Sequence, residues 1–146
     1  MADIIETKEN RVIIARMKPG EDLLQTAIKT VEEKNIMSGS LQMIGAVSGV
    51  NLGYFDVKEK KYKNFQVNED LEVVSCMGNV SRLQNGEIVV HAHMIVADST
   101  GRCYGGHLLE GCQVSVTIEL FIHETVDTLT RKEDHEFGLN LLALKD

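Results

Sequence analysis

Short apolar segments rich in β-branched residues recur along the chain and are separated by polar turn signals. Such segments predict strands, because β-branched side chains fit the pleated, half-buried surface of a sheet. The predicted strands span residues 11–17, 41–48, 50–57, 62–67, 71–77, 87–97 and 113–123. The last of them alternates most clearly, and one face is expected to carry Val114, Val116, Ile118, Leu120 and Ile122.

One stretch has a different period. Between residues 21 and 35 the apolar positions recur at three- and four-residue spacing, which predicts a helix with one buried stripe. The stripe consists of Leu23, Leu24, Ala27, Ile28 and Val31. Asp22, three residues before Gln25, suits the position that caps the start of a helix.

The order of these elements favours antiparallel pairing. Most predicted strands follow one another through short turns, such as Asn85-Gly86, whereas parallel strands need long crossovers. We therefore predict an α+β fold, with a curled, largely antiparallel sheet of about seven or eight strands and one main helix at about residues 21–35. The length of 146 residues suits a single domain over residues 1–146.

Charge and composition narrow the possible functions. The net charge is −7, from 15 Lys and Arg against 22 Asp and Glu, whereas nucleic-acid binders concentrate positive charge. No apolar run approaches the roughly 18 residues that a membrane helix needs. The first residues lack a secretory signal pattern, and Cys76, Cys103 and Cys112 lack the close pairing of a disulfide scaffold. We expect a cytoplasmic protein that has no membrane partner.

Two histidines share one face of a predicted strand. His91 and His93 lie two residues apart within 87–97, so their side chains point the same way, about 6.5–7 Å apart. The strand is apolar on both faces, which predicts a central, buried position. Buried imidazoles need polar partners, and the partner is either a metal ion shared by both rings or a hydrogen bond from the protein.

A third histidine follows the next turn. The turn at residues 98–101 returns the chain beside strand 87–97, and Gly105-Gly106 allows a close backbone approach just before His107. We therefore expect His107 to meet His91 and His93. Zinc is the predicted ion, because three histidines with an open fourth position are typical of catalytic zinc sites.

Chemistry at such a metal calls for a nearby carboxylate. Glu72 and Glu119 are acids within otherwise apolar strands, although each of them could simply face solvent or another subunit. We take Glu72 as the candidate catalytic residue. His123 and His135 lie in polar surroundings and are expected at the surface.

Five motifs occur together in a fixed order. They are Ser38-Gly39-Ser40-Leu41, Ile44-Gly45-Ala46-Val47-Ser48, Leu71-Glu72-Val73-Val74-Ser75 with Gly78-Asn79, His91-Ala92-His93 and Gly105-Gly106-His107-Leu108. This arrangement resembles the plants-and-prokaryotes-conserved (PPC) domain over about residues 8–125, leaving a C-terminal tail at 126–146.

The resemblance carries its own expectations. It implies an antiparallel α+β fold, a homotrimer and, in some prokaryotic members, a metal ion, typically zinc, which by motif falls on His91, His93 and His107. The fold is also similar to that of acetolactate decarboxylase, a three-histidine zinc enzyme, although fold alone does not fix chemistry. The tail becomes apolar at Leu139, Leu141 and Leu142 and is expected to dock on its own sheet or on a neighbouring subunit.

Three functions therefore stay open. The first is a trimeric zinc-binding protein, with any enzymatic role and any small-molecule ligand undetermined. The second is a DNA-binding or transcription-associated protein, as the family label suggests. The acidic charge disfavours this function, as does the absence of the Arg-Gly-Arg-Pro AT-hook that accompanies the domain in plants. The third is an oligomerisation module without chemistry.

Overall fold

A computed structural model describes residues 1–144, which contain one helix and nine strands. The helix is α1 (Leu23–Glu33). The strands are β1 (Glu9–Met17), β2 (Gly39–Asp56), β3 (Lys61–Val67), β4 (Leu71–Leu83), β5 (Ile88–Ala97), β6 (Cys103–Leu108), β7 (Gln113–Thr125), β8 (Thr130–Asp134) and β9 (Leu139–Ala143). The helix in this range is too short to cross a membrane.

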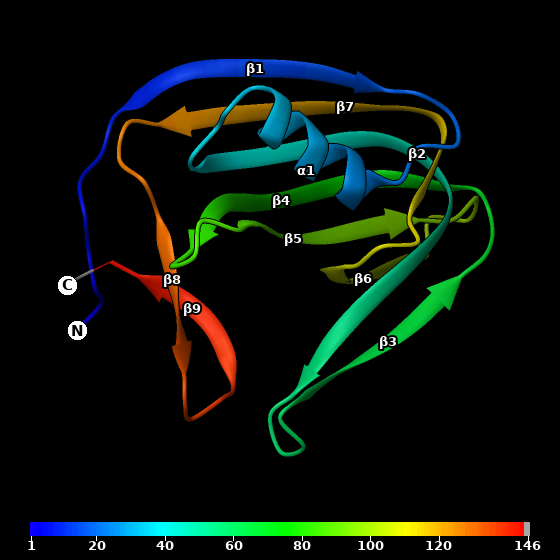
Figure 1. The fold of residues 1–146 in the computed structure, drawn as a ribbon. Coiled ribbons are helices and arrows are strands. Elements are labelled where there is room, and N and C mark those ends of the chain that lie inside the picture. The colour runs from blue at the N-terminus through cyan, green and yellow to red at the C-terminus, as the bar shows by residue number, and fades with distance from the viewer. Residues whose placement is uncertain (145–146) are drawn as a thin grey trace.

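All nine strands belong to one curled sheet, as predicted. Its order is β1-β7-β2-β6-β5-β4-β8-β9, with β3 attached to β2 and a further pairing between β2 and β4. The pairings are antiparallel except for the short parallel contact of β4 with β8. Strand β2 pairs with both β4 and β6, and β5 pairs with both β4 and β6 as well. The four strands β2, β6, β5 and β4 therefore form a closed ring of paired strands. Figure 1 shows two hairpins, β2–β3 and β8–β9, projecting at the bottom of the view.

The strand boundaries differ from the prediction in two ways. The two strands predicted at residues 41–48 and 50–57 are parts of the single strand β2, which ends at Asp56, because the chain passes Gly49 with a register shift against β7 and does not reverse its direction. Strands β6, β8 and β9 were not predicted as strands, since each has only five or six residues and lacks a clear alternation.

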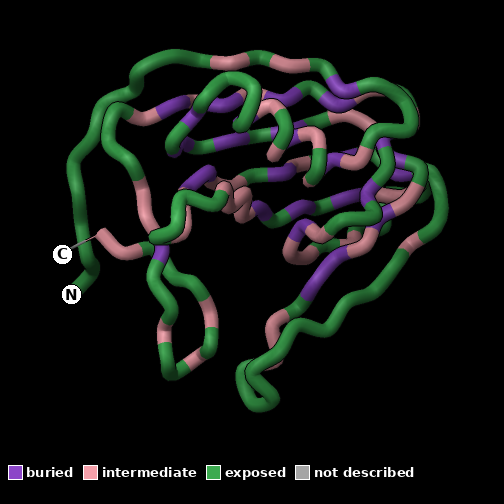
Figure 2. The backbone as a smooth tube through the Cα atoms, in the orientation of Figure 1, coloured by how far each residue is buried: buried purple, intermediate pink, exposed green. Residues whose placement is uncertain are grey.

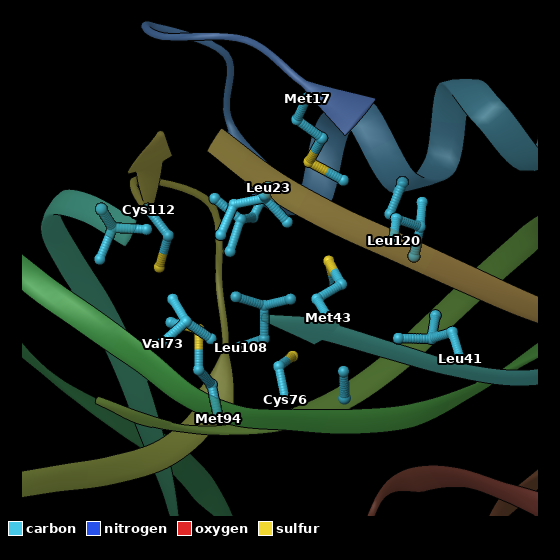
Figure 3. Close-up of a cluster of buried hydrophobic side chains, with 14 of the residues drawn as sticks. Met17, Leu23, Leu41, Met43, Val73, Cys76, Met94, Leu108, Cys112 and Leu120 are labelled. Atoms are coloured by element: carbon cyan, nitrogen blue, oxygen red, sulfur yellow. The ribbon is translucent and has the colours of Figure 1, made fainter. Parts of the chain in front are cut away.

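The helix contributes one face to the core, as its period predicted, although Leu24 and Ile28 of the predicted stripe are only half-buried. Leu23, Ala27 and Val31 are fully buried, and Asp22 caps the helix by accepting a hydrogen bond of 3.0 Å from the Gln25 amide. Figure 3 shows Leu23 converging with side chains from β2, β4, β5 and β7. Figure 2 places the buried segments along these strands, while the tip of the β2–β3 hairpin is exposed.

The outer face of the sheet is less buried than the sequence predicted. On β5 the inward side chains of Ala92, Met94 and Val96 are buried, but Ile95 on the opposite face is 48% exposed. The prediction of a strand covered on both sides was therefore wrong for the protomer, which leaves apolar residues of the outer face without cover.

Val116 is a second error in the predicted burial. It was expected to share the buried face of β7 with Val114 and Ile118, but it is 68% exposed. The register of β7 against β2 shifts between Gly45 and Val47, and this irregularity turns Val116 outward while its neighbours stay inside. A strict alternation cannot anticipate such a shift.

Candidate metal centre

Strand register brings the three histidines together on the outer face of the sheet. His93 on β5 is the direct register partner of His107 on β6, and His91 lies two residues from His93 on the same strand. The approach of β6 to β2 depends on Gly106, because a Cβ there would lie 2.7 Å from the Gly53 carbonyl oxygen. The glycines therefore let β6 approach closely, as the sequence predicted.

The three rings form a compact triangle. Their centroids lie 5.1 Å apart for His91–His93, 5.1 Å for His91–His107 and 5.5 Å for His93–His107. One ligand nitrogen from each ring lies within 4.8 Å of the others. His91 and His107 are half-buried, whereas His93 is exposed, so the group opens to solvent on one side.

The donor set fits a small divalent ion. The Nε2 atoms of His91 and His93 are 3.3 Å apart. Tetrahedral zinc with metal–nitrogen bonds of about 2.0–2.1 Å requires a nitrogen–nitrogen spacing of about 3.3 Å. Within residues 1–144, His107 Nδ1 is buried without a hydrogen-bond partner. A buried polar atom without a partner is costly, and a bound ion is one partner that this ring can take.

The surroundings keep two of the rings neutral. Burial, together with the nearby His91, His93 and Arg131, lowers the pKa of His107 from 6.5 to about 4. Burial, Arg131 and His93 also lower the pKa of His91. Because metals bind the neutral imidazole, both rings are ready to act as ligands at neutral pH.

Arg131 is a neighbour of the site that the sequence did not reveal. It is only 6% exposed, and its Nη2 lies 3.4 Å from His91 Nδ1 and 2.9 Å from the Asn79 side-chain oxygen, to which it donates. Arg131 reaches the site because β8 pairs in parallel with β4, about fifty residues earlier in the chain. No local pattern at residue 131 signals so distant a contact.

A cavity of about 170 Å³ opens beside the histidines. His91 and His107 line it together with Tyr62 from β3, Arg131 from β8 and Leu141 from β9. The Tyr62 ring packs against His107 in a tilted arrangement, with a centroid distance of 4.8 Å. Both hairpins that project in Figure 1 thus contribute lining residues to this cavity, together with β5 and β6.

Glu72 lies away from the three histidines. Its register partner on β5 is Ala97, four residues beyond His93, which corresponds to about 13 Å along the strand. Glu72 is exposed and lines a different cavity, of about 550 Å³, with Asp70 and Asp98. The structure does not bring the candidate catalytic carboxylate to the candidate metal centre.

The other polar residues singled out in the sequence lie outside the group as well. Glu119 is exposed on β7 and His135 is exposed in the β8–β9 turn. His123 is half-buried, and its Nδ1 lies 2.6 Å from a Glu9 carboxylate oxygen.

Residues 5–126 match the Plants and Prokaryotes Conserved (PCC) domain. The chain belongs to this family. Among curated proteins it is 30% identical over 136 residues to the bifunctional protein GlmU of Synechococcus sp. (strain JA-3-3Ab), a match that covers 92% of this chain and 20% of that protein. The chain therefore spans about one fifth of the length of this relative.

Two solved structures share nearly the whole fold of this chain. A metal-containing protein from Archaeoglobus fulgidus is 29% identical, with a TM-score of 0.89 over 97% of this chain and 99% of that one. A plant- and prokaryote-conserved (PPC) protein from Pyrococcus horikoshii is 30% identical, with a TM-score of 0.87 over 94% of each chain.

Two further structures bear on the expectations from sequence. A "Putative DNA-binding protein" from Ralstonia eutropha JMP134 is 26% identical, with a TM-score of 0.82 over 90% of each chain. Acetolactate decarboxylase from Bacillus subtilis subspecies spizizenii is 12% identical, with a TM-score of 0.55 over 96% of this chain and 62% of that one. The similarity to acetolactate decarboxylase confirms that the two proteins are similar in fold, as expected, and it concerns the fold alone.

Proposed function

We propose that this PPC-domain protein binds one zinc ion through His91, His93 and His107. The observation that carries the proposal is the convergence of three ligand nitrogens within 4.8 Å, with two of them at the 3.3 Å spacing that suits tetrahedral zinc. The structurally similar protein from Archaeoglobus fulgidus, 29% identical to this chain, is a metal-containing protein.

Three protein ligands leave one coordination position open, as in catalytic rather than structural zinc sites. A zinc ion held there would supply a Lewis acid or an acidified water to a small molecule. The chain itself contributes the neutral rings, the exposed approach past His93 and the cavity beside His107. Glu72 lies elsewhere, and the polar residues that line the cavity with the two histidines are Arg131, Tyr62 and Asn140.

Metal removal should lower the stability of the protein. A ligand that binds only the folded state at about 100 times its dissociation constant adds about 2.7 kcal/mol. For a chain of this size we expect zinc to raise the melting temperature by roughly 5–10 °C over the chelated protein. Differential scanning calorimetry with EDTA and with added zinc measures the shift, and magnesium serves as a control because it prefers oxygen ligands. Equal melting temperatures with zinc and with EDTA would contradict the site.

We also propose that the protein assembles as a homotrimer, the state that the family resemblance implies. Register partners across the sheet support an interface, because Ile14, Phe121, Gln42 and Met77 follow one another on neighbouring strands of the outer face. Of these, Ile14 is 66% exposed and Met77 is 65% exposed. Exposed apolar residues grouped in this way are typical of surfaces that another chain covers.

The replacement Ile14→Glu should convert the trimer to monomers. A charge within a buried interface is costly to desolvate, while the exposed position leaves the fold of the protomer intact. Sedimentation velocity should give about three times the 16.2 kDa chain mass for the wild type and one chain mass for the variant. Val57→Glu is the control, because Val57 is 60% exposed beyond the end of β2. A monomeric wild type would contradict the proposal.

DNA binding is a second candidate, favoured by the name of the Ralstonia eutropha relative and opposed by the charge of −7. Binding that depends on phosphate contacts weakens steeply with salt. A titration of duplex DNA from about 50 to 200 mM salt decides between the two functions. We expect no binding even at the lowest salt.

A further inference from the structure

Arg131 carries a positive charge that no acid neutralises within residues 1–144. Only 6% of its surface is exposed, so the residue is more than nine-tenths buried. None of the ion pairs in this range includes Arg131. Burial lowers the pKa of Arg131, yet guanidinium stays charged in proteins. A buried charge is normally paired, so an anion is the kind of partner that this guanidinium would bind.

Neutral hydrogen-bond acceptors are bound to only some of the N–H groups of the guanidinium. Nε donates to Ser81 Oγ at 2.7 Å, Nη1 donates to the Asn140 carbonyl oxygen at 2.9 Å, and Nη2 donates to the Asn79 side-chain oxygen at 2.9 Å. Of the five N–H groups, one on Nη1 and one on Nη2 remain. The second of these faces His91 Nδ1 at 3.4 Å, which is a long contact.

Metal binding would remove even this long contact. If His91 bound an ion through Nε2, the atom that lies 3.3 Å from His93 Nε2, its Nδ1 would carry the hydrogen. Two donors, His91 Nδ1 and Arg131 Nη2, would then face each other with no acceptor between them. An oxygen atom with negative charge satisfies both donors at once.

The cavity beside Arg131 has space for a small ligand. Its volume of about 170 Å³ equals roughly five or six water molecules. Apart from the two histidines, Arg131 and the Tyr62 ring, its lining is mainly aliphatic: Val89, Val90, Leu139 and Leu141, with Asn140. An anionic head at Arg131 with a short apolar body matches this lining.

We propose that this cavity binds a short-chain carboxylate whose oxygens accept hydrogen bonds from Arg131 next to the three histidines. This inference rests on the proposed metal site, whose substrate class it names. A carboxylate fits better than inorganic phosphate, because it brings one charge and two oxygens to one guanidinium with two remaining donors. Inorganic phosphate brings more charge and more acceptors than the cavity offers, since its lining is otherwise mainly apolar.

The test uses the full chain loaded with cobalt(II), whose visible spectrum reports ligands that bind at or beside the metal. Cobalt stoichiometry is measured first. The protein is then titrated with butyrate, with butyramide as a neutral probe of nearly the same shape, and with inorganic phosphate. We expect butyrate to bind at least about 10-fold more tightly than either of the others, because its charge is paired with Arg131.

Two changes in the chain identify the part that Arg131 plays. Arg131→Met should retain cobalt and lose at least about 10-fold in butyrate affinity, with little change for butyramide. Because Arg131 also joins β8 to β4, a second pair of variants leaves it in place. Leu141→Glu adds a competing carboxylate at the 39% exposed wall of the cavity and should weaken butyrate binding, whereas the matched Leu141→Gln should not.

The outcomes separate this inference from the metal site on which it rests. A protein that takes up no cobalt contradicts the metal site. A protein that takes up cobalt but binds butyrate and butyramide equally contradicts the carboxylate site alone. The carboxylate site is also contradicted if Arg131→Met and Leu141→Glu, each made singly, bind butyrate as tightly as the wild type, because the metal by itself would then account for butyrate binding. Tighter binding of phosphate would contradict the choice of a carboxylate.

Discussion

The replacement His107→Ala is expected to lower the affinity for zinc by more than about 100-fold while the protein stays folded. Changing a residue that merely supports a ligand costs about 10–100-fold in metal affinity, and His107 is proposed as a ligand itself. The fold should tolerate the change, because the ring is only half-buried and its Nδ1 has no hydrogen-bond partner within residues 1–144. Competition with a fluorescent chelator gives the two affinities.

His135→Ala is the matched control for this experiment. It removes the same side chain from an exposed turn between β8 and β9, so the zinc affinity should stay at the wild-type value. If His107→Ala bound zinc as tightly as His135→Ala, the third ring would not be a ligand. The centre would then be reduced to the His91–His93 pair.

Gly78→Ala should give a large loss of stability in the part of the sheet that carries the histidines. A Cβ at this position of β4 would overlap the His91 carbonyl oxygen and the Cα of Ala92, so β5 would have to move away. Forcing atoms into a packed site costs about 3 kcal/mol, which lowers the melting temperature by roughly 6–12 °C. Because β5 carries His91, zinc affinity should fall as well.

Gly49→Ala provides the comparison. Its added Cβ would meet its nearest neighbour, the Val67 carbonyl oxygen, only at the 3.4 Å of ordinary contact. We expect that variant to change stability by less than about 1 kcal/mol. Urea denaturation of both proteins, together with zinc titrations, measures the difference. If both variants unfolded at the same urea concentration, β4 and β5 would not be packed as closely as described.

The elements with a long, regular period could be predicted from the sequence. The helix at α1 and its buried stripe follow from apolar spacing alone, and β7 follows from its alternation. The meeting of His107 with the HxH pair was also predictable, because a short turn joins β5 to β6 and fixes which residues face each other. Each of these features depends only on residues that are close together in the chain.

Features that depend on distant pairing could not be predicted. Arg131 comes beside His91 only through the parallel contact of β8 with β4, and Tyr62 comes over His107 only because the β2–β3 hairpin extends past β6. Glu72 illustrates the opposite case, since an acid in an apolar strand suggested a catalytic role, yet the register carries it to another cavity. Periodicity gives the face of a strand but not the neighbours across the sheet.

Anomalous diffraction at the zinc edge, on crystals grown with zinc, tests the central claim most directly. The account predicts one peak per chain, with ring nitrogens of His91, His93 and His107 at about 2.0–2.1 Å from it. A zinc peak elsewhere, for instance at the exposed Cys103, with the three rings free of metal, would contradict it.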